Sequence, residues 1–139
     1  MRKIVKQQMF EETFILNDKI TNVASHLEML GYDVELFDSN ESWLLKNLVS
    51  KEMDCVINGV KIKLTASYAY TENERGYLLM HYSKYIDKWN REIVVRQDIK
   101  NMNSQQICEL ILQYVDEMVK RYKEYKRCTF TIINEGMIV

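Results

Sequence analysis

The chain contains two histidines, and one of them, His81, has neighbours that could give it a chemical role. General-base chemistry needs an imidazole, a carboxylate that orients the ring and a hydroxyl within reach. In the strand register predicted below, His81 lies opposite Asp98 and close to Ser83. A carboxylate in that position would orient the imidazole and raise its pKa. This set predicts a small hydrolase-like enzyme built on His81 and Asp98, one of three functions that the sequence leaves open.

His81 also belongs to a wider group of charged and aromatic residues that alternate with apolar ones. On a sheet, this alternation places the group together on one polar face. The predicted binding residues are Lys61, Lys63, Tyr77, His81, Tyr85, Arg96 and Asp98. Such a face could bind another protein, or the phosphates and bases of a nucleic acid or nucleotide ligand. The alternative is an ordinary solvated face, which antiparallel sheets commonly have.

The sequence contains no pattern typical of phosphate binding or metal binding. The four glycines are isolated, so no phosphate-binding loop is present. Neither histidine stands at metal-ligand spacing from a cysteine or carboxylate, and no calcium-binding loop occurs. We therefore expect no cofactor and no metal. The net charge of −1 gives no global reason to bind nucleic acid or an acidic membrane.

The three cysteines, Cys55, Cys108 and Cys128, are far apart and each lies in an apolar pattern. This usage indicates reduced packing residues in a cytosolic protein. No apolar run approaches about 18 residues, so we expect no transmembrane helix.

The elements that would position these residues centre on a hairpin at 53–70. Asn58-Gly59 is the pair that a two-residue type I′ turn favours, because both central residues need a positive φ. The turn pairs Ile57 with Val60, and the same register places Asp54 opposite Lys63 on the polar face.

Two further strands, 77–86 and 92–99, follow through short connections, with a turn expected at 87–91. If neighbours in sequence are also neighbours in the sheet, the four strands form an antiparallel meander. The expected opposite pairs are Thr65 with His81, Lys61 with Tyr85, His81 with Asp98, and Ser83 with Arg96.

Helices are predicted at 17–30, ending at Gly31, and at about 104–126, starting at Asn103 or Ser104. Short strands are predicted at 32–37 and 129–133, while 43–51 is a short helix or an irregular strand. Residues 1–16 are compatible with a strand or a helix. The predicted fold is a single α+β domain, 1–139, with an antiparallel β-meander sheet of about 4–6 strands. The N-terminal helix and the long C-terminal helix are expected to pack on one face.

The first expected function is that of a non-enzymatic cytosolic protein that acts by binding another protein. Lys, Asn, Ile and Tyr make up roughly a third of the chain, a bias common in low-GC bacteria and their phages. This suggests a phage or mobile-element inhibitor of a host defence system. The contacting surface would be the polar face or the apolar C-terminal strand, which as a sheet edge could also form a homodimer. A nucleic-acid or nucleotide binder using the polar face is the alternative.

Overall fold

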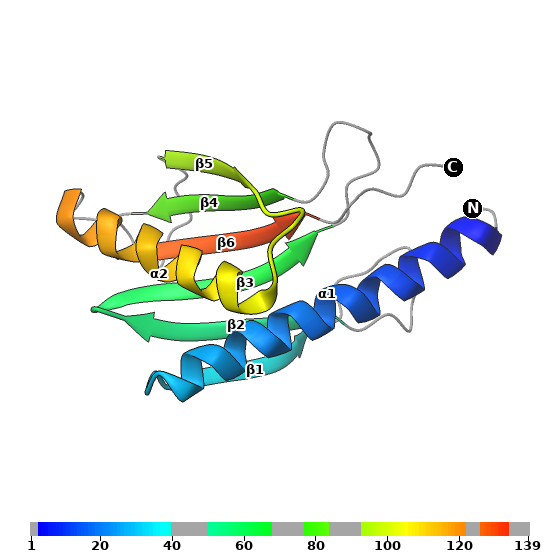
Figure 1. The fold of residues 1–139 in the computed structure, drawn as a ribbon, viewed down its shortest axis with the longest axis horizontal. Coiled ribbons are helices and arrows are strands. Elements are labelled where there is room, and N and C mark those ends of the chain that lie inside the picture. Colours follow the sequence, from blue (N-terminus) through cyan, green and yellow to red (C-terminus); the bar gives the residue numbers. More distant parts are fainter. Residues whose placement is uncertain (1–2, 40–49, 68–76, 84–92, 122–125, 134–139) are drawn as a thin grey trace.

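The computed structural model describes residues 3–39, 50–67, 77–83, 93–121 and 126–133 (Figure 1). These residues form two helices and one six-stranded sheet, so the predicted α+β class is confirmed. In chain order the elements are α1 (Lys3–Met29), β1 (Val34–Ser39), β2 (Ser50–Ile57), β3 (Val60–Ser67), β4 (Tyr77–Ser83), β5 (Ile93–Asp98), α2 (Ser104–Arg121) and β6 (Arg127–Ile133).

The hairpin of β2 and β3 has the predicted register. Asn58 and Gly59 have φ values of 51° and 81°, as a type I′ turn requires. Ile57 pairs with Val60, and Asp54 pairs with Lys63. The local turn chemistry therefore sets the pairing of these two strands.

The sheet order, β1-β2-β3-β6-β4-β5, corrects the predicted meander. Strand β6 lies between β3 and β4, parallel to β3 and antiparallel to β4. The reason is the connection through α2. A helix is long enough to carry the chain back across the sheet, so β6 need not pair with the strand that precedes it.

The C-terminal strand is consequently not an edge. β6 is paired on both sides, and the edges of the described sheet are β1 and β5. The prediction that the apolar C-terminal strand offers a free sheet edge is therefore wrong for β6, and 134–139 lies outside the described residues. Most of the predicted element at 43–51 also lies outside the described residues. Its last two residues, 50 and 51, belong to β2.

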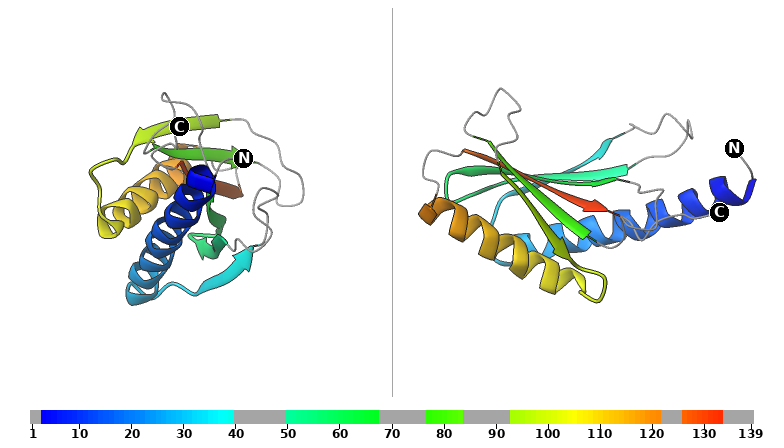
Figure 2. Two further views of the ribbon diagram at one scale, coloured as in Figure 1. Left: turned by 90° about the vertical axis from the view of Figure 1, so that its right-hand side faces the viewer. Right: turned by 90° about the horizontal axis from the view of Figure 1, so that it is seen from above.

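Both helices lie on the same side of the sheet (Figures 1 and 2). The core forms there from one set of alternate strand positions and the sheet-facing stripes of the helices. Phe130 is fully buried between Leu64 on β3 and Met80 on β4. The helices contribute Leu16, Ile20, Val23, Ala24, Leu27, Ile107, Cys108, Ile111, Val115 and Met118.

The helix ends follow capping rules. By sequence, residues 1–16 are compatible with a strand or a helix. Because α1 begins at Lys3, residues 3–16 are helical. Gly31, with φ of 96°, takes the left-handed position after α1, and Tyr32 N–H donates to Leu27 O at 3.1 Å. Before α2, Asn103 and Gln106 exchange two backbone-to-side-chain hydrogen bonds of 2.9 Å, which identifies Asn103 as the cap.

Candidate functional site

The sheet face turned away from both helices, called the outer face below, carries the polar residues of the central strands. Alternation places Asp54 of β2, Lys63 of β3, Thr129 of β6 and His81 of β4 in one row across it. In the next row, Thr65 of β3 donates a hydrogen bond from its Oγ1 to the Glu52 carboxylate of β2 at 3.1 Å. The polar face is therefore present, with a different arrangement from the one predicted.

His81 and Asp98 are not opposite each other. His81 pairs with Val94 and with Thr129, whereas Asp98 pairs with Tyr77, four residues along β4. Four strand residues span about 13 Å, too far for a hydrogen bond between the two side chains. The Asp98 carboxylate instead accepts a hydrogen bond from Lys100 N–H at 2.9 Å. The structure therefore does not bring His81 and Asp98 together as the predicted hydrolase-like site requires.

The other predicted pairs across these strands are also wrong. The structure places Thr65 opposite Thr131, Lys61 opposite Arg127, Leu79 opposite Arg96, and Ser83 opposite Arg127. Two physical causes act together. Strand β6 occupies the place next to β3, and the predicted turn at 87–91, between β4 and β5, lies outside the described residues. That connection contains no Asn-Gly pair, so its sequence does not specify a register.

The predicted binding residues fall into separate places. Lys61 and Lys63 lie on β3, whereas Arg96 and Asp98 lie on β5, three strand spacings or about 14 Å away. His81, between them on β4, is buried. Tyr77 belongs to β4, opposite Asp98, and Tyr85 lies outside the described residues. The predicted face is thus not one continuous site.

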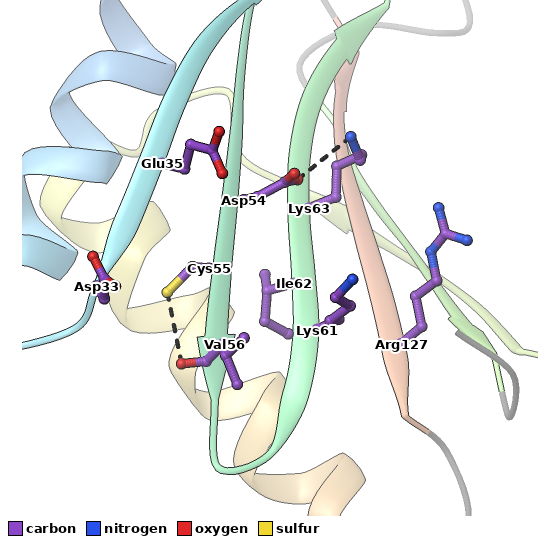
Figure 3. Close-up of a pocket in the computed structure, with 9 residues that line it drawn as sticks. All are labelled: Asp33, Glu35, Asp54, Cys55, Val56, Lys61, Ile62, Lys63 and Arg127. Atoms are coloured by element: carbon purple, nitrogen blue, oxygen red, sulfur yellow. Dashed lines mark hydrogen bonds and ion pairs between the residues drawn. The ribbon is translucent and has the colours of Figure 1, made fainter. Parts of the chain in front are cut away.

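Lys61 and Lys63 instead contribute to a hollow of about 380 Å³ at the β1–β2–β3–β6 side of the sheet (Figure 3). We call it the charged hollow. Its lining residues are Asp33, Glu35, Asp54, Cys55, Val56, Lys61, Ile62, Lys63 and Arg127. Cys55 and Ile62 belong to the core-facing set of positions, and the charged side chains rise from the outer face.

Lys63 is the best-connected cation of the charged hollow. Its Nζ lies 3.4 Å from Asp54 Oδ1 and 3.6 Å from Glu52 Oε2. It also lies 5.0 Å from the centroid of the Phe37 ring, within cation–π range. Glu52 is buried, and its other oxygen accepts a hydrogen bond from Thr65 Oγ1 at 3.1 Å. These contacts hold Lys63 in place and satisfy a carboxylate that would otherwise be costly to bury.

Three other charged residues of the hollow have fewer charged partners than Lys63. Within the described residues, Asp33, Glu35 and Lys61 form no ion pair. Glu35 lies directly opposite Asp54, and Lys61 directly opposite Arg127. Like charges at opposite positions on neighbouring strands repel, which destabilises the sheet locally. The charged hollow therefore keeps an acidic side on β1–β2 and a basic side on β3–β6.

Val56 separates the two sides of the charged hollow. It lies on β2, opposite Lys61, and 56% of it is exposed. Sequence reasoning missed Val56, Asp33, Glu35 and Arg127 as site residues. The only usable signal was the Asp54–Lys63 pairing, because the hollow also depends on where β1 and β6 join the sheet.

The thiols do not add a nucleophile to the site. Burial raises the pKa of Cys55, and the negative charge of Asp33 raises it further. Burial likewise raises the pKa of Cys108 and holds that of Cys128 well above its usual range. All three are free and buried, consistent with a packing role.

The described residues contain no group of three or more His, Cys, Asp or Glu side chains arranged to hold a metal ion. Neither of the helices, over the part of the chain that is described, is long and apolar enough to cross a membrane. Comparisons with protein-family models, curated proteins and solved structures found no match to this chain. The charged hollow remains the candidate site with the most distinctive chemistry.

Proposed function

We propose that this is a non-enzymatic cytoplasmic protein that binds another protein through the charged hollow. The observation that carries the proposal is the balance of charge around the exposed Val56. Asp33, Glu35 and Asp54 line one side, and Lys61, Lys63 and Arg127 line the other. Protein surfaces present acidic, basic and apolar groups together, and complementary charges across an interface set orientation and specificity.

A nucleic acid is a poorer match to the same residues. Its phosphates would be drawn to the basic side but repelled by carboxylates only one or two strand spacings away, about 5–10 Å. Binding of nucleic acid normally depends on a surface with a clear excess of basic groups. The balanced charge of the hollow therefore favours a protein partner.

The proposed absence of catalysis is supported by the chemistry of the described groups. His81 is buried and lies about 13 Å along the sheet from the position facing Asp98. The thiols are buried, and raised pKa values make them poor nucleophiles at neutral pH. As a class of partner we propose a protein of the host of a phage or mobile element, on the basis of residue usage.

Capture of partners from a bacterial host lysate tests the function. The wild-type protein is compared with Val56→Arg, which places a long side chain in the middle of the charged hollow. Gln113→Arg is the matched control, because it makes the same change at an exposed position of α2. A captured protein is then purified, and its affinity for each variant is measured by calorimetry.

We expect wild type and Gln113→Arg to bind the purified partner equally, and Val56→Arg to bind it at least about tenfold more weakly, the effect of losing a central contact. Equal binding by all three proteins would show that the hollow is the wrong surface. A lysate that yields no protein binding wild type with a measurable affinity would contradict the proposed function.

A further inference from the structure

The charges of the hollow are ordered in one direction across the strands. Asp33 and Glu35 lie at β1, Val56 on β2, and Lys61 on β3 (Figure 3). The distance from β1 to β3 is two strand spacings, or about 10 Å. Glu35 lies in the row of Asp54 and Lys61 in the row of Val56, two residues along the strand, so the line from Glu35 to Lys61 runs diagonally over about 12 Å, which long side chains can bridge. The two ends of this row are the charges that form no ion pair within the described residues.

Each end of this row is receptive to an opposite charge, because Glu35 and Lys61 form no ion pair within the described residues. Glu35 faces the carboxylate of Asp54, whose only described ion pair is with Lys63. Lys61 faces Arg127. A cation placed at β1 would pair with Glu35 and an anion placed at β3 would pair with Lys61, neither of which has an ion pair within the described residues, and an apolar group between them would cover Val56.

We propose that the partner inserts a helix that carries a basic side chain, an apolar side chain and an acidic side chain along one face. This inference rests on the proposed function and names the chemistry of the contact. Residues i and i+7 of a helix are about 10 Å apart, with i+4 between them on the same face. The basic residue at one end lies at Glu35, the apolar residue at Val56 and the acidic residue at Lys61.

The shape of the site favours a protruding element over a second copy of this chain. Two hollows placed face to face would enclose unfilled volume, and unfilled volume forfeits packing energy. A single helix laid across the strands fills the hollow instead, as in other helix-in-groove contacts.

Three synthetic helical peptides of equal length test the charge pattern. The mixed peptide carries Arg at i, Leu at i+4 and Glu at i+7. The basic peptide carries Arg at both ends of the motif, and the acidic peptide carries Glu at both. Binding is followed by NMR through the backbone amides of Val56 and Lys61. We expect the mixed peptide to bind wild type about tenfold more tightly than either single-sign peptide.

Reversing one charge of the hollow should change which of the three peptides binds best. Glu35→Lys leaves an excess of positive charge in the hollow and should bind the acidic peptide best. Lys61→Glu leaves an excess of negative charge and should bind the basic peptide best. Combining the two substitutions should restore preference for the mixed peptide, now docked in the reverse direction. Lys100→Glu, in the turn before α2, is the control and should keep the wild-type order.

The inference is overturned if wild type binds a single-sign peptide as tightly as the mixed one, or if millimolar mixed peptide leaves both amides unshifted. It is also overturned by self-association that each single variant abolishes and a mixture of the two variants restores, which would assign the hollow to a second copy. The proposed function is judged separately: a captured partner sensitive to Val56→Arg keeps the function even if the peptides disprove the charge pattern.

Discussion

Two threonines on the outer face differ in whether their hydroxyl has a hydrogen-bond partner within the described residues. Thr65 donates its hydrogen bond to the buried carboxylate of Glu52. Thr129, on the neighbouring strand β6, is buried, and its Oγ1 has no hydrogen-bond partner within the part of the chain that the structure describes. An unsatisfied buried hydroxyl costs free energy because it has lost water without gaining a protein partner.

Thr129→Val should therefore stabilise the protein by about 1 kcal/mol, because it replaces the unsatisfied hydroxyl with a methyl group of similar size. Thr65→Val should destabilise it by about 1–2 kcal/mol, because Glu52 loses a donor. Urea denaturation of both variants measures the two changes in the free energy of unfolding. The explanation is wrong if both substitutions shift that free energy in the same direction.

At the scale of the elements, the β2–β3 hairpin depends on a turn that few residues can form. Gly59 has a φ of 81°, in the region that L-residues with a Cβ avoid. Gly59→Ala should lower the free energy of unfolding by about 1 kcal/mol through backbone strain alone, since no atom lies within 4 Å of the added Cβ. Gly59→Asn should cost less, because Asn tolerates this conformation better. Equal losses in thermal or urea unfolding would argue against strain as the cause.

The difference between local turns and long-range strand pairing explains what the sequence alone could predict. The β2–β3 register follows from two adjacent residues, Asn58 and Gly59, so local physics is sufficient. The position of β6 is set by which apolar rows fit together, and a period of two specifies the faces of a strand but not its neighbours.

The candidate site was correspondingly only half predictable. Lys61 and Lys63 follow from the hairpin, as does the Asp54 carboxylate facing Lys63. Glu35 and Arg127 join them only because β1 pairs with β2 and β6 pairs with β3. No short-range signal reports either pairing, so the charged hollow becomes visible only in three dimensions.

At the scale of the whole molecule, burial of the thiols couples stability to pH. In the unfolded chain a thiol ionises near its ordinary pKa of 9.0, whereas in the folded protein burial keeps the pKa of Cys128 well above that value. Above about pH 9 the unfolded state therefore binds fewer protons, and the free energy of unfolding falls as pH rises. Below that pH both states hold the proton, so the contribution is complete.

Urea unfolding measured from about pH 8 to pH 10 should show this decline, and Cys128→Val should make the slope shallower because the titrating group is gone. Comparing slopes separates the titration from any constant change in stability caused by repacking. An unchanged slope in Cys128→Val would mean that other groups control the alkaline loss of stability.

The central position of β6 has a consequence for how the protein is made. β1, β2 and β3 form one block of paired strands and β4 with β5 forms another, and within the described residues only β6 joins the two blocks. During synthesis both blocks emerge before β6, each with an inner edge whose backbone groups have no strand beside them. The described sheet therefore becomes continuous only after the chain has been translated past Ile133, and a nascent chain that stalls earlier exposes two edges open to aggregation.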